Sequence, residues 1–201
     1  MKRETEAVLL PAWDDSVHDA QRGFRAILKA LSEPGTVQAM SFAISAPAPL
    51  DVASTAACLT LLDCDTPLYM HVAADKMTLE AYLGFHCGCP IVTTPDAAAF
   101  ALIVAPHMDL QLDQFAQGSA EYPDRSATLL IQVDSLTQGS RRRLTGPGIA
   151  GEALLCVDGL PHDFDAQWQH NAAAFPLGVD VIFCCGDAIV GLPRTTQIHR
   201  S

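Results

Sequence analysis

An almost continuous apolar run at residues 127–133 constrains the fold more than any other part of the sequence. A strand with one exposed face alternates apolar and polar residues, whereas a strand covered on both faces is apolar along most of its length. The run therefore predicts a strand in the interior of a sheet, with other elements packed on both sides of it.

Helical and strand patterns alternate along the rest of the chain. The first helix is the clearest, because Val17, Phe24 and Leu28 recur at helical spacing and Ser16 with Asp19 forms a partial capping signal. Helices are expected over residues 16–31, 52–62, 76–85, 110–115 and 163–174, and further strands over residues 36–44, 68–72, 91–93, 100–105, 180–185 and 188–192. This alternation predicts an α/β fold, a mixed β-sheet flanked by helices in a three-layer arrangement.

Proline and glycine interrupt short segments throughout, without repeats or long linkers. We therefore expect residues 16–201 to form a single α/β domain and residues 1–15 a flexible N-terminal segment. The start of the chain carries charges and only four consecutive apolar residues at 7–10, too few for a signal peptide. No run approaches the roughly 18 apolar residues of a membrane span. These features predict a cytoplasmic protein without a membrane partner.

The charge balance restricts the partners. Twelve basic against 23 acidic residues give a net charge of -11, which repels a phosphate backbone, so we expect no nucleic-acid partner. Only 17% of residues are charged while 49% are hydrophobic. Because soluble domains usually have about 25% charged residues, this composition favours permanent interfaces and hence oligomerisation.

The segment from Gly146 to Gly151 matches the dinucleotide-binding pattern G-x-G-x-x-G. That pattern requires a buried strand before it and a helix after it. Here the preceding residues 141–145 are polar, and the following residues reach at most two helical turns before residues 158–161 interrupt them. We therefore interpret Gly146 and Gly148 as turn residues that supply positive φ angles.

The sequence gives only weak evidence for a metal site, a redox-active cysteine pair or a Schiff-base lysine. His86, Cys87 and Cys89 are close together, but C-x-C with a distant Cys184-Cys185 pair does not fit a structural zinc site. The seven cysteines, an odd number, are expected to be reduced thiols. Lys2 lies in the N-terminal segment, and Lys29 and Lys76 lie among polar residues, so none is placed for a Schiff base. We expect no cofactor and no metal.

The segment Arg194-Thr195-Thr196 is the first candidate ligand site. It follows a predicted strand and offers a cation and two hydroxyls, a group suited to bind an oxyanion. The alternative, slightly favoured, is that Arg194 pairs with a carboxylate of a neighbouring subunit.

Three further groups have two interpretations each. Arg25 is a ligand or interface candidate, or forms a structural ion pair with Glu33. Asp63 and Asp65 present carboxylates at a cleft or, as we favour, stabilise a turn. The basic cluster at residues 141–143 steers an anionic ligand or forms a solvated or interface strip. The residues alone define no catalytic cluster.

A set of short strings, in their order and spacing, resembles the H subunit of the bacterial carbon–phosphorus lyase system over about residues 16–198. The strings are Phe24-Arg25, Ala30-Leu31-Ser32-Glu33-Pro34-Gly35, Leu59-Thr60-Leu61-Leu62-Asp63-Cys64-Asp65-Thr66-Pro67, Phe85-His86, Ala127-Thr128-Leu129, Leu144-Thr145-Gly146-Pro147-Gly148-Ile149, Phe175-Pro176-Leu177-Gly178-Val179-Asp180 and Pro193-Arg194-Thr195-Thr196.

The resemblance implies a function and partners. The family acts with sister subunits to displace adenine from ATP with a phosphonate, which gives a ribose 1-phosphonate 5-triphosphate. It implies a homodimer within a core complex of G, H, I and J subunits, with no turnover by the H subunit alone. It also implies a fold similar to the large domain of pyridoxal-phosphate-dependent transferases, without that cofactor. The alternative is a stand-alone binder or enzyme for a phosphonate or nucleotide that uses a transferase-like cleft.

Overall fold

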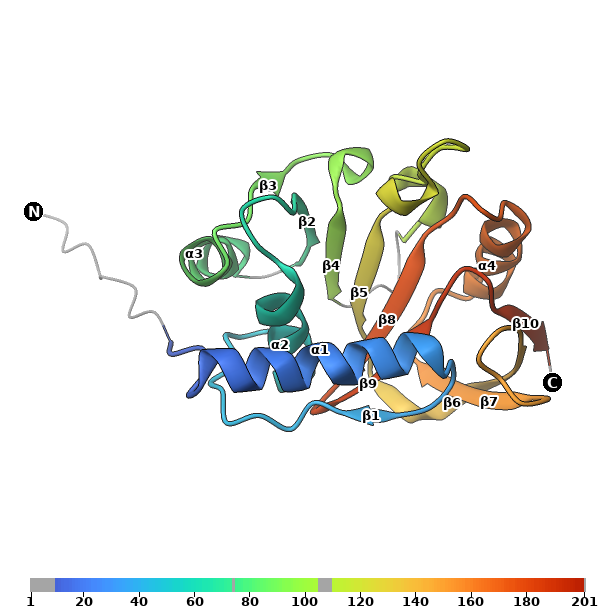
Figure 1. Ribbon diagram of the computed structural model, residues 1–201, viewed down its shortest axis with the longest axis horizontal. Helices are drawn as coiled ribbons and strands as arrows, with labels where there is room; N and C mark the ends of the chain where they lie inside the picture. Colours follow the sequence, from blue (N-terminus) through green and yellow to red (C-terminus); the bar gives the residue numbers. More distant parts are fainter. Residues whose placement is uncertain (1–9, 74, 105–109, 201) are drawn as a thin grey trace, which may run out of the picture.

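The structure is a computed structural model that describes residues 10–73, 75–104 and 110–200 (Figure 1). Its α-helices are α1 (Ser16–Ser32), α2 (Val52–Leu61), α3 (Lys76–His86) and α4 (Phe164–Ala173), and its 3-10 helices are η1 (Pro95–Ala97), η2 (Leu112–Gln114) and η3 (Pro123–Arg125). Its strands are β1 (Gln38–Ala39), β2 (Leu68–His71), β3 (Ile91–Val92), β4 (Phe100–Val104), β5 (Thr128–Gln132), β6 (Ser135–Thr145), β7 (Ala153–Asp158), β8 (Asp180–Cys185), β9 (Ala188–Leu192) and β10 (Gln197–Arg200).

The main sheet has the strand order β1-β9-β8-β5-β4-β2-β3. The strands β3, β2, β4, β5 and β8 are parallel, and β9 and β1 extend the sheet in antiparallel fashion. The predicted interior strand is β5, whose Leu129 lies between Ala101 of β4 and Val181 of β8. The position of the apolar run in the sheet is therefore confirmed.

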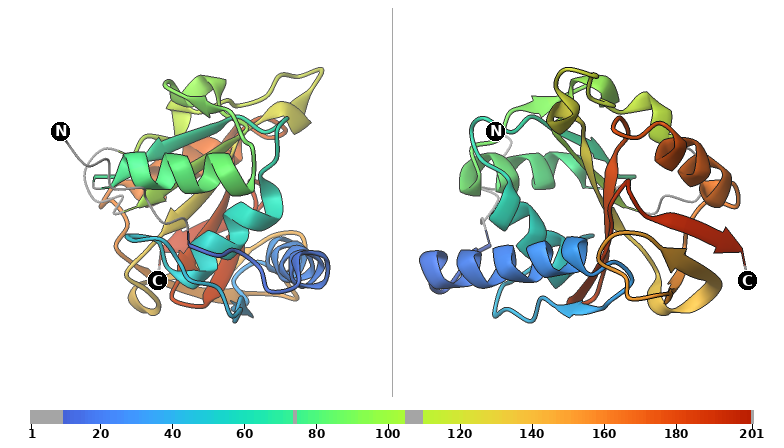
Figure 2. Two further views of the ribbon diagram at one scale, coloured as in Figure 1. Left: turned by 90° about the vertical axis from the view of Figure 1, so that its left-hand side faces the viewer. Right: turned by 45° about the vertical axis from the view of Figure 1, so that its right-hand side comes forward.

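The two faces of the main sheet are covered by different elements. Helices α1, α2 and α3 lie on one face, while α4 and the small sheet β10-β6-β7 lie on the other (Figures 1 and 2). Each face of the sheet carries its own hydrophobic core, and the side chains of β5 alternate between them. Leu130 packs in the core on the side of α1, α2 and α3, and Leu129 and Ile131 pack in the core on the side of α4 and the small sheet. The predicted α/β class, a mixed sheet flanked by helices, is confirmed.

Helix starts follow local capping chemistry. Asp51 caps α2 as predicted, and its carboxylate accepts a hydrogen bond of 2.7 Å from the backbone N–H of Ser54. In α1 the cap is Asp15, one residue before the expected Ser16, and its carboxylate accepts from the N–H groups of Val17 and His18. Residues 1–9 of the predicted flexible segment lie outside the described residues.

Two predicted elements are much shorter than expected. Of residues 36–44, only Gln38 and Ala39 pair with β9, because β9 begins at Ala188 and the next amide, of Met40, meets the turn residue Asp187 at 2.7 Å. The expected helix at 110–115 is the single turn η2. The backbone is extended at Gln111 before it and at Phe115 after it, which limits the helix to this turn.

The small sheet was not predicted. Its longest strand, β6, includes the polar residues 141–143, which we interpret from the sequence as a basic cluster and assign to no strand. In the structure Arg141 and Arg143 are exposed, while Arg142 lies inward and is 5% exposed. An inward arginine is tolerated because its Nε donates to Asp165 and its Nη1 donates to the Val157 carbonyl. Residues 153–158, for which no element was predicted, form β7 because they pair with β6.

Gly191 allows α1 to approach β9 closely. A Cβ atom at this position would lie 2.4 Å from the carbonyl oxygen of Ala30, which is backbone and cannot rotate away. We therefore expect Gly191→Ala to lower the free energy of unfolding by about 2 to 3 kcal/mol, the usual cost of overpacking. Urea denaturation followed by circular dichroism measures the effect.

The matched control is Gly84→Ala in α3, where an added Cβ would meet no atom within 4 Å. Alanine is the better helix former, so this variant should be more stable by about 0.5 to 1 kcal/mol. Equal stability of Gly191→Ala and the wild type would contradict the packing of α1 on β9.

Candidate functional site

Arg194 lies at the centre of a hydrogen-bond network within its own chain. Its guanidinium donates to Asp180, to the Ser126 hydroxyl, and to the carbonyl oxygens of Pro123 (3.1 Å) and Pro176 (3.4 Å). These contacts use all five N–H donors of an arginine. The carboxylate partner is Asp180 at the start of β8, and the backbone N–H of Arg194 also donates to it (2.8 Å). The geometry favours a structural role over an oxyanion site.

Thr195 and Thr196 lie beside the glycine turn. The Thr196 carbonyl accepts a hydrogen bond of 2.9 Å from the Trp168 indole, and its buried hydroxyl has no hydrogen-bond partner within the described structure. A Cβ atom at Gly146 would lie 3.0 Å from the Thr195 carbonyl oxygen. The structure thus brings together two groups that are about 50 residues apart in the sequence.

The glycine segment is a turn between β6 and β7. Gly146 and Gly148 have φ angles of 142° and 81°, in the region that favours glycine. Because β6 and β7 form an antiparallel hairpin, no helix follows this turn, and the first-turn amides that would hold a pyrophosphate are missing there. A Cβ atom at Gly148 would lie 2.0 Å from the Ser32 carbonyl oxygen, so this glycine allows the turn to pack on the end of α1.

The remaining sequence candidates lie apart from one another. Arg25 is exposed on α1, and the recorded partner of Glu33 is Lys29 at 4.0 Å, so the suggested pairing of Arg25 with Glu33 is not the one formed. Asp63 and Asp65 share a turn, where the Asp63 carboxylate accepts from the Asp65 N–H at 2.9 Å. This is the turn chemistry that the sequence favours.

Three of the seven cysteines are buried, three are half-buried, and Cys64 is exposed. Burial raises the pKa of Cys87 to about 12 and raises the pKa of Cys58 well above its ordinary value, which keeps both thiols protonated. The His86 imidazole contacts the Leu10 carbonyl oxygen at 3.0 Å instead of a cysteine. Within residues 10–73, 75–104 and 110–200, no three His, Cys, Asp or Glu side chains gather in a metal-binding group.

One polar hollow lies where the β6–β7 hairpin meets the start of α4. Its volume is about 320 Å³, and we call it the arginine pocket; it is lined by Ser140, Arg141, Arg142, Val157, Asp158, Gly159, Leu160, Pro161, His162 and Asp165. The Arg142–Asp165 ion pair forms its inner wall, with side chains 6% and 13% exposed. Two aspartates balance the two arginines, so the pocket has little net charge for steering an anion.

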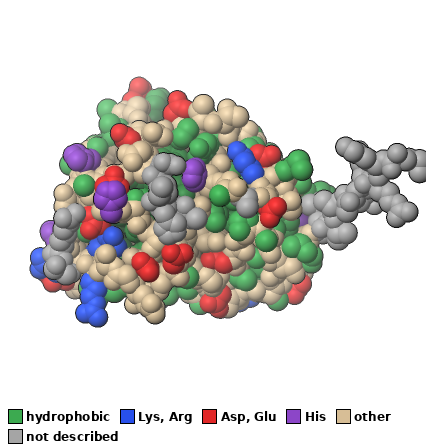
Figure 3. Space-filling model, turned by 180° about the vertical axis from the view of Figure 1, so that it is seen from behind, with side chains coloured by type: hydrophobic (Ala, Val, Ile, Leu, Met, Phe, Trp, Pro, Cys, Tyr) green, Lys and Arg blue, Asp and Glu red, His purple; other side chains and the backbone are tan. Residues whose placement is uncertain are grey.

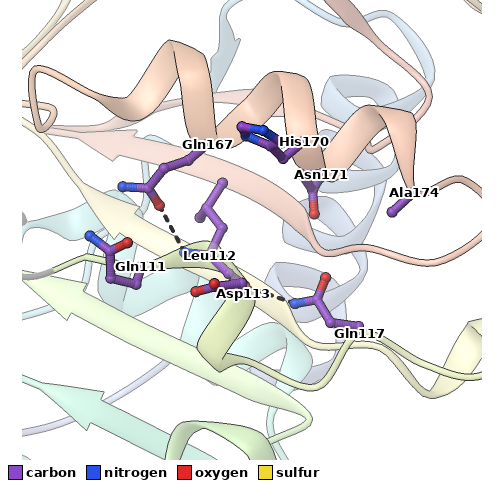
Figure 4. A pocket seen from close by; sticks show the side chains of 8 residues that line it. All are labelled: Gln111, Leu112, Asp113, Gln117, Gln167, His170, Asn171 and Ala174. Atoms are coloured by element: carbon purple, nitrogen blue, oxygen red, sulfur yellow. Dashed lines mark hydrogen bonds between the residues drawn. The ribbon is translucent and has the colours of Figure 1, made fainter.

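A second hollow of about 320 Å³ lies between α4 and η2, and we call it the amide pocket (Figure 4). It is lined by Gln111, Leu112, Asp113, Gln117, Gln167, His170, Asn171 and Ala174. The Gln167 amide bridges the backbone of Leu110 and Leu112 with two bonds of 2.9 Å, and the Asn171 amide bonds both backbone groups of Val179.

Sequence reasoning missed the amide pocket. Its side chains come from residues 111–117 and 167–174, and no short motif links two segments about 50 residues apart. The only local signal is the unusual number of amide side chains in each segment, which by itself is equally typical of a solvated surface.

Exposed apolar side chains form a stripe along α1. Val17, Phe24 and Leu28 are 62%, 53% and 56% exposed, and their spacing of seven and four residues places them on one side of the helix. Phe85 of α3 is 69% exposed.

On the opposite face of the molecule, acidic and histidine side chains are prominent and basic ones gather mainly at one end (Figure 3). In the described ranges, no helix combines the length and apolar character needed to cross a bilayer.

The fold and the hollows define a mixed-sheet α/β protein with two small polar pockets and an apolar helix face. Residues 11–199 match the family described as bacterial phosphonate metabolism protein (PhnH). The chain therefore belongs to this family.

Two curated proteins are similar to it. The alpha-D-ribose 1-methylphosphonate 5-triphosphate synthase subunit PhnH of Rhizobium meliloti (strain 1021) is 38% identical over 189 residues, 94% of each chain. The putative C-P lyase subunit protein HtxG of Stutzerimonas stutzeri is 43% identical over 82 residues, 41% of this chain and 42% of that protein.

Proposed function

We propose that this chain is a subunit of a carbon–phosphorus lyase complex in organic phosphonate catabolism. In that role it supports the ATP-dependent synthesis of alpha-D-ribose 1-phosphonate 5-triphosphate, in which a phosphonate displaces adenine from ATP. The observation that carries the proposal is the relation to the Rhizobium meliloti synthase subunit, which covers 94% of both chains.

The proposal extends to the assembly. The chain forms a homodimer and joins G, I and J subunits in the cytoplasm, with no turnover by itself. Two observations support this: the low charged fraction of 17% and the apolar stripe of α1. We also propose that the α/β fold is of the pyridoxal-phosphate transferase type; the seven-stranded mixed sheet with helices on both faces is compatible with it.

Co-expression tests the proposal directly. A tag fused to Met1 should retain the G, I and J proteins in stoichiometric amounts, measured by native mass spectrometry. Adenine release from ATP and methylphosphonate should require the assembled set and be absent for the isolated chain. A solitary protein that retains none of the others, or adenine release by the chain alone, would overturn the proposal.

A second candidate is a stand-alone binder or enzyme for a phosphonate or nucleotide. The arginine pocket, a hollow of about 320 Å³ lined by Arg141 and Arg142, favours it, since that size suits a small molecule. Saturating methylphosphonate or ATP would then raise the melting temperature of the isolated chain. An unchanged melting temperature would leave the subunit role as the better account.

A further inference from the structure

The outer rim of the amide pocket is built so that nitrogen donors point into the protein. Gln117 shows this most clearly: its Nε2 donates to the carbonyl oxygens of Leu112 and Phe115, each at 2.8 Å. Because a carbonyl oxygen only accepts hydrogen bonds, the nitrogen must be the end of the amide that meets them. The other end, Oε1, has no recorded partner in the described structure and remains an acceptor at the pocket wall (Figure 4).

His170 presents an acceptor in the same way. Its Nδ1 lies 2.8 Å from the carbonyl oxygen of Ala166, one turn earlier in α4. That contact requires the proton on Nδ1, so the other nitrogen of a neutral ring, Nε2, carries a lone pair. A donor in the pocket therefore finds an acceptor in this ring.

Asp113 gives the pocket its charge. It is exposed on η2 and is the only acidic residue among those that line the pocket, which include no lysine or arginine. The Gln111 amide can still donate as well as accept. Gln117, Gln167 and Asn171 each donate an amide N–H to a backbone carbonyl oxygen of the protein.

We propose that the amide pocket binds a small organic cation whose ammonium or guanidinium group donates hydrogen bonds to Asp113, Gln117 Oε1 and His170 Nε2. Ammonium and guanidinium groups have only donors, so they complement a wall of acceptors, and the carboxylate makes the contact charge-assisted. This inference does not rest on the proposed function and assigns a ligand class that the subunit role does not require.

Two other ligand classes fit the pocket less well. A phosphate, phosphonate or nucleotide would meet the Asp113 carboxylate without a lining arginine or lysine to offset it, on a chain with a net charge of -11. A metal ion would find one carboxylate and one imidazole, fewer than the three or four protein ligands of most metal sites.

Isothermal titration of the full chain with agmatine tests the proposal, because agmatine carries both a guanidinium and a primary ammonium group. The ionic strength is held at about 0.15 M so that general attraction to the acidic surface is screened. We expect saturable binding by the wild type and at least about tenfold weaker binding by Asp113→Asn, which keeps the side-chain size and removes the charge. Signals of the His170 ring in NMR spectra should shift on agmatine addition in the wild type.

The matched control is Asp14→Asn, an exposed carboxylate near the start of α1 that does not line the amide pocket. It should bind agmatine within about twofold of the wild type, since both variants change the net charge equally. Thermal unfolding checks that Asp113→Asn is folded. Equal weakening by the two variants, no binding at millimolar agmatine, or saturable binding of ribose 5-phosphate at this pocket would each overturn the proposal.

Discussion

Replacing Arg194 by methionine is expected to lower the free energy of unfolding by about 3 kcal/mol or more. The side chains of Arg194 and Asp180 are 13% and 23% exposed, so the substitution leaves a largely enclosed carboxylate without its cation. It also removes the hydrogen bonds from the Arg194 guanidinium to the carbonyl oxygens of Pro123 and Pro176. Urea denaturation of the isolated chain measures the loss.

The control for this prediction is Arg22→Met on α1. Arg22 pairs with Asp19 at 3.0 Å, but its side chain is 60% exposed, and such surface pairs contribute about 0 to 1 kcal/mol. Adding Asp180→Asn to Arg194→Met should recover part of the loss, because the unpaired charge disappears. A stable Arg194→Met protein would instead return Arg194 to the list of ligand-binding candidates and contradict the structural role.

The fold was predictable where one segment decides its own structure. The apolar run at 127–133 predicts β5, and Asp51 predicts the start of α2. Both predictions succeed because burial of a strand on both faces and capping of a helix by a side chain depend on a few neighbouring residues. The strand β6 was not predictable in this way. Its inward Arg142 is stabilised by Asp165, 23 residues later, and a polar residue at a core position indicates a loop when its partner is unknown.

The roles of the candidate site residues were likewise predictable only where neighbouring residues decide them. Turn roles for Asp63 and Gly146 follow from residue type and short spacing, and the geometry agrees with them. The role of Arg194 depends on which acceptors surround it, and these come from three segments of the chain. The sequence therefore offered an oxyanion or a neighbouring subunit as its partner, although the partner is Asp180 of the same chain.

Replacing Phe24 by glutamate is expected to convert the proposed homodimer into a monomer. The stripe of Val17, Phe24 and Leu28 runs along an exposed side of the 17-residue helix α1, and a second copy of the chain is the occupant we propose for it. A two-fold dimer places the same stripe of both subunits together, so each substitution enters the contact twice. Buried carboxylates facing each other should weaken dimerisation by at least about 100-fold. Sedimentation equilibrium measures the dissociation constant.

The matched control is Phe85→Glu on α3, which introduces the same charge at a phenylalanine that is 69% exposed. Both phenylalanines are exposed within the single chain, so both variants should fold, which circular dichroism checks. A monomeric Phe24→Glu beside a dimeric Phe85→Glu would place the dimer contact on α1, because net charge and folding are equal in the two proteins. The opposite result would move the contact to α3, and a monomeric wild type would remove the homodimer from the proposed assembly.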